Sequence, residues 1–152
     1  MDSATLKELL YEHCERFVEE RISNIQHAME NARAAQQDDT KSSAGDKYET
    51  TREMMTQELE NLSTQLHQLL VQRNMLQSMQ LDKKNVRAEA GSLVETDKGF
   101  YFISIGAGNA EIEGKNIVCI SPAAPLSVAM LGKKERDSFL FRNMSYKVLM
   151  VT

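Results

Sequence analysis

The chain has 152 residues, of which 41% are hydrophobic and 26% are charged, and its formal net charge is -4. This composition is typical of a folded, soluble protein and excludes an intrinsically disordered chain. No apolar run approaches the roughly 18 residues that a membrane span needs, and the first residues lack the apolar stretch of a signal peptide. We therefore expect a cytoplasmic protein without a membrane partner.

The acidic charge is concentrated in the first part of the chain. Residues 1–84 contain 15 Asp or Glu and 10 Lys or Arg, whereas residues 85–152 contain 7 and 8. Proteins that bind nucleic acid directly need a basic surface that displaces counterions from the phosphate backbone. An acidic first half therefore argues against direct, specific nucleic-acid binding.

Residues that could carry chemistry are sparse. Cys14 and Cys119 lie in opposite halves without the spacing of a metal site, so we expect two reduced structural thiols. The 3 His residues are scattered over the first half, and no grouping of Ser, His and Asp favours nucleophilic catalysis. We expect no enzymatic activity, no cofactor and no metal site in the chain itself.

The first long element is predicted as a helix from Thr5 to about Gln36, because this stretch contains neither Pro nor Gly. Apolar residues recur there in alternating steps of four and three, at Val18, Ile22, Ile25, Met29 and Ala32. That spacing predicts a coiled-coil seam. Towards the N-terminus Leu6, Leu10 and Phe17 widen the apolar face, as expected if this end of the helix packs against another domain.

Residues 46–80 are predicted to form a second helix of matching length. Its seam consists of Met55, Leu59, Leu62, Leu66, Leu69 and Leu76, with a break at Arg73. The segment between the helices, about residues 37–47, is polar and contains a Gly near its end, which is typical of a turn. Residues 1–84 should therefore form an antiparallel helical hairpin with arms of roughly 50 Å, at about 1.5 Å per residue.

After residue 84 the periodicity changes from helical to strand-like, and this change marks the predicted domain boundary. β-Branched and aromatic runs predict five strands, at residues 92–95, 100–105, 116–120, 138–141 and 146–151. Residues 124–131 predict a short helix that stops at Gly132, and residues 106–108 are interpreted as a β-turn. The predicted fold class is α+β: a helical hairpin over residues 1–84, and a small antiparallel sheet with one short helix over residues 85–152.

Two segments of this sequence resemble the Gre family of bacterial transcript cleavage factors. The start of the second helix carries Tyr48, Arg52 and Glu53, which is similar to the family pattern AEYxxAREQQ. Residues 120–137 are similar to the family's Ser-Pro, short helix, Leu-Ile-Gly-Lys and Gly-Asp pattern, although Arg136 replaces the second Gly. The likeness covers nearly the whole chain and is that of a divergent member.

The resemblance implies a fold and a partner. Gre proteins combine a coiled-coil hairpin with a C-terminal domain similar to the FKBP fold. Their C-terminal domain docks at the mouth of the secondary channel of bacterial RNA polymerase, and their hairpin enters the channel. By resemblance, the residues expected to take part in docking are Ser121, Pro122, Gly132, Lys133 and Asp137.

The tip of the predicted hairpin departs from the family. Gre tips carry an Asp and a Glu three residues apart, which help the polymerase to hold a second Mg²⁺, a hard ion that takes oxygen ligands. Alignment on Tyr48 places Lys41 and Ala44 at those positions, so the activating pair is absent in register. The tip candidates for contact with the polymerase active centre are Asp38, Asp39, Lys41, Asp46, Lys47 and Glu49.

The acidic tip residues also have structural interpretations. Asp46 and Glu49 have the spacing of a pair that caps a helix N-terminus. Asp38 and Asp39 follow the end of the first helix, where the helix dipole is unfavourable to acids, so they should serve solubility or a partner.

Two functions are consistent with these patterns. The leading hypothesis is a monomeric, cytoplasmic regulator that binds RNA polymerase and occupies its secondary channel, modulating elongation or initiation, with no cofactor except Mg²⁺ shared with the polymerase. The rival hypothesis is a coiled-coil protein-binding module or holdase-like chaperone, because Met-rich helices offer adaptable contact surfaces.

Overall fold

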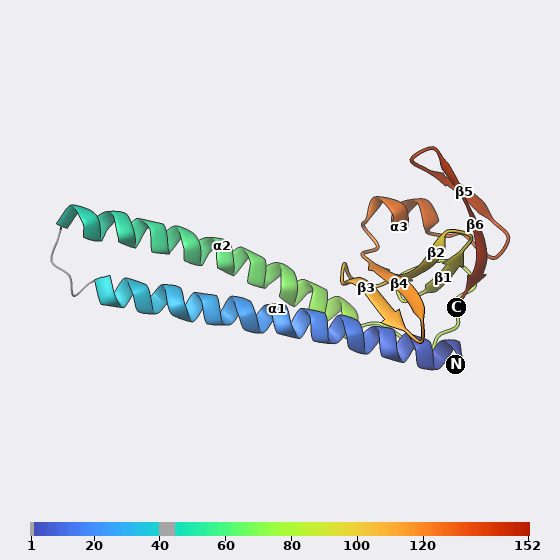
Figure 1. The fold of residues 1–152 in the computed structure, drawn as a ribbon, viewed down its shortest axis with the longest axis horizontal. Coiled ribbons are helices and arrows are strands. Elements are labelled where there is room, and N and C mark those ends of the chain that lie inside the picture. The colour runs from blue at the N-terminus through green and yellow to red at the C-terminus, as the bar shows by residue number, and fades with distance from the viewer. Residues whose placement is uncertain (1, 40–44) are drawn as a thin grey trace. The chain divides into compact units, whose positions relative to one another are not determined.

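The computed structural model describes the backbone of residues 2–39 and 45–152, and the side chains of residues 2–37 and 49–152. Two long helices come first, α1 (Ser3–Asp39) and α2 (Gly45–Gln77), and they are followed by six strands and the short helix α3 (Pro125–Met130) (Figure 1). The chain divides into two compact units. One unit is Val18–Arg73, and the other combines Met1–Phe17 with Asn74–Thr152.

Helix α1 begins with a side-chain cap. The Oδ1 atom of Asp2 accepts a hydrogen bond from the backbone N–H of Thr5 at 2.8 Å, which satisfies one of the free amides of the first turn. This bond lowers the pKa of the Asp2 carboxyl below its ordinary value.

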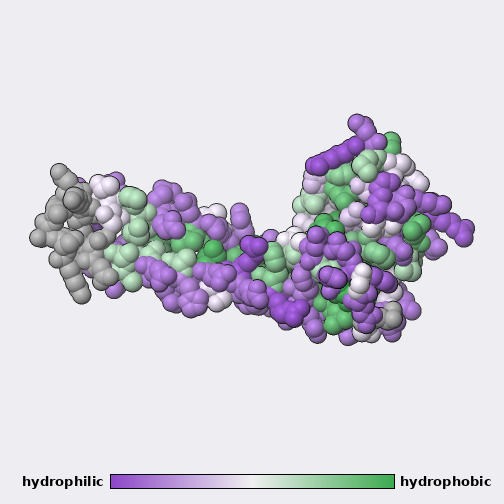
Figure 2. Space-filling model, viewed as in Figure 1, coloured by the Kyte–Doolittle hydropathy of each residue, from purple (hydrophilic) through white to green (hydrophobic). Residues whose placement is uncertain are grey.

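The unit Val18–Arg73 is a helical hairpin, and its predicted seam on α1 is confirmed. Val18, Ile22 and Ala32 are buried, and Ile25 and Met29 are half-buried. Figure 2 shows apolar side chains along the line between the two helices, with hydrophilic side chains on either side of it. Burial of this narrow stripe stabilises the helix pair, because isolated helices are only marginally stable in water.

The α2 half of the seam is confirmed as well, and two polar contacts give its register. Leu62 is buried, and Met55, Leu59, Leu66 and Leu69 are half-buried. The Nε2 atom of Gln36 donates to Oγ1 of Thr56 at 3.2 Å, and Nη1 of Arg73 lies 3.5 Å from Oε1 of Glu19. The residue numbers of each pair, 36 with 56 and 19 with 73, add up to 92. A constant sum is the signature of two antiparallel helices in one register.

The helices end at other residues than predicted. The turn was expected over about residues 37–47, but α1 continues to Asp39 and α2 already begins at Gly45. Polar composition suggested a turn, yet Gln and Asp are tolerated at the last positions of a long, established helix. At the other end α2 stops at Gln77 rather than near residue 80.

The second unit contains one six-stranded sheet in the order β3-β4-β2-β1-β6-β5. Its strands are β1 (Leu93–Thr96), β2 (Gly99–Ile103), β3 (Gly108–Ile112), β4 (Lys115–Ile120), β5 (Ser138–Phe141) and β6 (Met144–Val151). The α+β class is confirmed, with two corrections to the sheet. It has six strands rather than five, and β2 pairs with β4 in parallel while the other pairs are antiparallel.

Helices cover both faces of this sheet. On one face Met130 of α3 belongs to a buried cluster with Tyr101, Ile103, Phe139 and other core residues. On the opposite face Cys14 of α1 reaches the sheet, where its Sγ lies 3.4 Å from Oγ of Ser104. Because β2 is covered on both sides, its sequence is continuously apolar instead of alternating. The start of α1 therefore packs against the sheet, and both belong to one compact unit.

The missed strand, β3, lies at the edge of the sheet. Of its residues only Ala110 is buried, and none is aromatic. It pairs with β4 through a two-residue turn in which Glu113 and Gly114 have φ angles of 50° and 75°. Such left-handed turns match the twist of a hairpin. Residues 106–108 were interpreted as a turn, but Gly108 is already the first residue of this strand.

Candidate functional site

The predicted tip residues lie at one end of the hairpin, where α1 stops and α2 starts. Asp38 and Asp39 are the last residues of α1, and Asp46 and Lys47 belong to the first turn of α2, but their side chains lie outside the described residues. Lys41 lies entirely outside them. Glu49 follows on α2, and its side chain is exposed to solvent. The proposed capping pair of Asp46 and Glu49 stays a prediction.

The segment at residues 120–137, which carries the expected docking residues, forms α3 and the turns on either side of it. Ser121 begins the turn before the helix: its Oγ accepts the N–H of Ala123 at 3.2 Å, and its carbonyl accepts the N–H of Ala124 at 3.0 Å. Pro125 then occupies the first turn of the helix, where its fixed φ is favourable and no N–H is needed. Ser121 and Pro122 are both half-buried. The bonds of Ser121 and the fixed φ of Pro125 therefore favour the start of α3 at this point in the chain.

Gly132 and Lys133 anchor the other end of α3 to the segment that precedes β1. The N–H of Gly132 donates to the carbonyl of Ala88 at 2.8 Å, and the N–H of Ala88 donates to the carbonyl of Lys133 at 2.8 Å. The φ of Gly132 is 80°, a left-handed conformation in which Gly is favoured. Nη1 of Arg87 adds a bond to the carbonyl of Gly132 at 3.0 Å.

Asp137 holds the turn between α3 and β5. Its Oδ2 accepts the N–H of Lys134 at 3.0 Å, and its own N–H donates to the carbonyl of Lys134 at 3.0 Å. Arg136, the residue that replaces the family's Gly, takes a φ of 77°. A non-Gly residue in that region is strained, and the bond from its N–H to the carbonyl of Val148 at 2.9 Å helps to hold it there.

The residues that α3 presents to solvent were not among the sequence predictions. Val128 is 61% exposed and Leu131 is 39% exposed, whereas Met130 between them is fully buried. Figure 2 shows apolar surface among hydrophilic side chains in the region where Figure 1 places α3. We call Val128 and Leu131 the α3 patch. Val128 and Leu131 are three residues apart, so they lie on the same side of the helix, and Met130 lies on another side. This spacing in the sequence could have indicated that one apolar side of the helix faces solvent.

The two thiols meet between α1 and β4. Cys14 and Cys119 are both buried and free. The Cys14 thiol and burial raise the pKa of Cys119, so this side chain stays a neutral thiol. Close by, Nε2 of His13 lies 3.1 Å from the carbonyl oxygen of Ala107. These contacts attach α1 to the sheet and offer no nucleophile to solvent.

Within the part of the chain that the structure describes, no group of three His, Cys, Asp or Glu residues is arranged to hold a metal ion. Among the described helices, none is both long enough and apolar enough to cross a membrane.

No protein-family model and no curated protein matches the chain. Among solved structures it is similar to the crystal structure of GreA factor homolog 1 (Gfh1) of Thermus thermophilus, with 18% identity, a TM-score of 0.37, and coverage of 91% of this chain and 94% of that one. It is also similar to a structure of the transcription factor Gfh1, with 18% identity, a TM-score of 0.33, and coverage of 93% and 92%. Because both TM-scores are below 0.5, neither likeness decides what this chain does.

Proposed function

We propose that this protein is a transcription regulator that binds bacterial RNA polymerase through its sheet unit and inserts its helical hairpin into the secondary channel. It acts as a monomer in the cytoplasm and has no catalytic activity or cofactor of its own. The observation that carries the proposal is the segment at residues 120–137, whose Gre-like sequence coincides with a Ser-Pro turn, a short helix and a Gly-Lys turn. The hairpin with its two matched seams gives independent support.

The expected docking residues support this role indirectly. Ser121, Gly132 and Asp137 bond to backbone atoms around α3, so they shape the surface rather than form it. The α3 patch is the apolar part of that surface, and burying it against a partner would remove apolar surface from water, which favours association. We therefore assign the polymerase contact to the α3 patch, with Lys133 beside it.

The tip determines what the bound protein does. Stimulated cleavage of the transcript needs two carboxylates that hold a second Mg²⁺. Lys41 and Ala44 stand at the corresponding positions, so the tip lacks that pair in register. The proposed action is therefore occupancy of the channel, which modulates pausing or initiation and competes with factors that do stimulate cleavage.

Binding is tested with purified polymerase from the cognate bacterium and the full chain. We expect saturable binding that Val128→Asp weakens at least about tenfold, because it buries a charge in the interface. Leu140→Asp is the matched control: Leu140 is 74% exposed, and along β5 it alternates with the buried Phe139 and faces away from α3. Absence of binding by the unmodified protein, together with suppression of aggregation of unfolded clients, would favour a holdase-like chaperone instead.

The role of the tip is tested on stalled elongation complexes. We expect the protein to leave the transcript intact and to reduce the cleavage caused by an added Gre factor. The double variant Asp38→Asn, Asp39→Asn should compete as well as the unmodified chain. Robust cleavage that this double variant abolishes would contradict the proposed action and assign the two carboxylates to metal binding.

A further inference from the structure

The middle of the helical hairpin carries no charged side chain. Residues 22–29 of α1 and residues 61–72 of α2 contain no Asp, Glu, Lys or Arg. The whole chain is 26% charged, and the solvent-facing sides of paired helices usually carry charged residues, so the loss of charge over both stretches is unusual. We call residues 22–29 and 61–72 the neutral belt.

The two stretches of the belt lie beside each other in the hairpin. In the antiparallel register facing residue numbers add up to 92, which places residues 22–29 opposite residues 63–70. Charged residues return at both ends of the belt, namely Arg21 and Glu30 on α1 and Glu60 and Arg73 on α2. The loss of charge is therefore confined to one level of the hairpin and is shared by both helices at that level.

The belt encloses the hairpin on every exposed side. An α-helix has 3.6 residues per turn, so each stretch is more than two turns long and includes all directions around its helix. Its exposed side chains are Ser, Thr, Asn, Gln and His, together with Val71, which is 54% exposed. A partner on one side would leave the other side in water, where charged side chains are favourable. A partner that surrounds the hairpin accounts for a belt on all sides.

A groove of about 280 Å³ lies within this level of the hairpin. Half-buried Ile25 and Leu69 give it apolar surface, and its other lining residues are Arg21, Asn24, Gln65, Gln68 and Gln72. Among the described residues, the exposed amide side chains in this lining make no hydrogen bond to the rest of the chain. Their donors and acceptors are therefore available to a partner.

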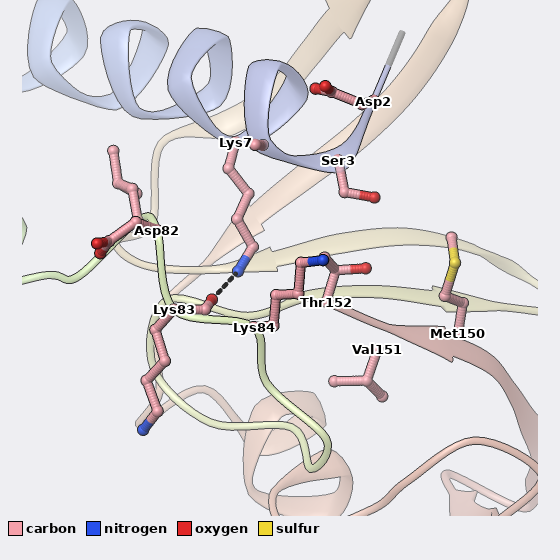
Figure 3. A pocket seen from close by; sticks show the side chains of 11 residues that line it. Asp2, Ser3, Lys7, Asp82, Lys83, Lys84, Met150, Val151 and Thr152 are labelled. Carbon is pink, nitrogen blue, oxygen red and sulfur yellow. Dashed lines mark hydrogen bonds between the residues drawn. The ribbon is translucent and has the colours of Figure 1, made fainter.

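A second cavity, in the sheet unit, is lined differently. It has a volume of about 460 Å³, and its lining includes the charged residues Asp2, Asp82 and Lys84. Figure 3 shows these residues around Lys7, whose ammonium donates to the carbonyl oxygen of Lys83 at 3.3 Å. Charges of both signs are typical of a surface that stays in contact with water. The groove in the hairpin has one charged lining residue, at the end of the belt.

We propose that the neutral belt is the level at which the wall of the polymerase secondary channel closes around the hairpin, with a side chain of the wall seated in the groove. This inference rests on the proposed function, which supplies the surrounding partner. Burying a charge without a partner costs free energy, and the buried parts of protein interfaces are depleted of charged residues. Amide side chains can instead donate to and accept from the polar groups of the wall.

The charge requirement is tested by binding of the full chain to purified polymerase from the cognate bacterium. Gln68→Glu and Gln68→Lys place opposite charges at one exposed position of the belt, and the three residue types have similar helix propensities, so the helix should be kept. We expect both variants to bind at least about tenfold more weakly, because either charge would be buried without a partner. Circular dichroism checks that their helicity is unchanged.

The matched controls make the same changes outside the belt. Gln77 is the exposed last residue of α2. Gln77→Glu and Gln77→Lys should bind like the unmodified chain, because the added charge stays in water.

The two histidines of the belt report on the contact directly. The side chain of His27 is 73% exposed, and His67 is exposed as well. Modification by diethylpyrocarbonate, followed by mass spectrometry, measures how accessible each ring is. We expect both rings to react several-fold more slowly in the polymerase complex than in the isolated chain, because a surrounding wall excludes the reagent from both helices.

Several results would overturn the proposal. If one charge at Gln68 weakens binding and the other strengthens it, the belt faces a charged, solvated surface. If neither charge changes the affinity, the belt lies outside the interface, while the proposed function stands. Protection of only one histidine, or protection that grows with the concentration of the isolated chain, would indicate a one-sided partner or a second copy. Absence of polymerase binding by the unmodified chain would refute the proposed function and this inference with it.

Discussion

Two charged residues occupy positions that an apolar helix stripe would otherwise fill. Lys7 lies three residues before the buried Leu10 and seven before the buried Cys14, so it shares their face of α1. Arg73 interrupts the seam of α2, and its guanidinium pairs with Glu19 on the facing helix. Both groups of that pair are more than a third exposed, so solvent screens it, and it contributes to register more than to stability. Lys7 is different because it is buried.

The burial of Lys7 predicts a specific dependence of stability on pH. Its pKa is lowered from 10.5 in the folded state, so the unfolded chain binds more protons at this group. Folding stability must then rise as pH increases through the lowered pKa towards 10.5. Unfolding by urea between pH 7 and about 10.5 should show the unmodified protein gaining stability relative to Lys7→Met. A constant or falling difference between the two proteins would contradict the buried charge.

At the scale of elements, the hairpin and the sheet are stabilised in different ways. The hairpin depends on one narrow seam with few fully buried side chains, whereas the sheet is covered by helices on both faces. The turns between paired strands hold residues in left-handed conformations, and the backbone hydrogen bonds of the flanking strand pairs offset that strain. The β3–β4 turn uses two left-handed residues, and so does the turn between β5 and β6, at Arg142 and Asn143.

The seam is tested by Leu62→Ala. Leu62 is only 6% exposed, so truncation should destabilise the hairpin by about 2 to 3 kcal/mol through lost burial and a residual cavity. Helicity followed by circular dichroism during urea unfolding measures the change. Met54→Ala, at a side chain that is 61% exposed on the same helix, should change stability by less than about 0.5 kcal/mol. Equal effects of the two substitutions would refute the assigned seam.

The β3–β4 turn is tested by Gly114→Ala. Gly114 has a φ of 75°, where a Cβ costs about 1 kcal/mol, although the surrounding space is open. Gly106→Ala is a control of the same chemistry, because Gly106 has open space and no left-handed φ. Thermal unfolding should show a lower melting temperature for Gly114→Ala and an almost unchanged melting temperature for Gly106→Ala.

At the scale of the whole molecule, the chain consists of two compact units with unequal cores. The unit with the sheet is discontinuous in sequence, since Met1–Phe17 joins Asn74–Thr152. The predicted domain boundary after residue 84 falls in the segment between α2 and β1, and it stays a prediction. Helix α1 contributes residues to both units, so its first turns and its later turns are stabilised by different neighbours.

Hydrogen exchange should therefore resolve two levels of protection. Amides of β2 and β4, whose residues include the fully buried Phe102, Ile103 and Ile117, should exchange most slowly. Amides of α2 around residues 51–59, where no side chain is fully buried, should exchange faster. Mass spectrometry of the exchanged peptides measures both. Uniform protection across the two units would show that they unfold as one.

The sequence by itself determined both helix seams, the apolar strands and the position of α3, because each depends on a local period or on a Pro or Gly at an element's end. Tertiary structure alone decided the edge strand β3, the parallel pairing of β2 with β4 and the burial of Lys7. The edge strand β3 has one buried residue, so its sequence shows no alternation of apolar and polar residues. The parallel pairing of β2 with β4 depends on how the chain crosses the sheet between them, which the local sequence does not encode. Lys7 is buried because the segment around Lys83, 76 residues further along the chain, folds over its ammonium group. Such a contact leaves no trace in the sequence around either residue.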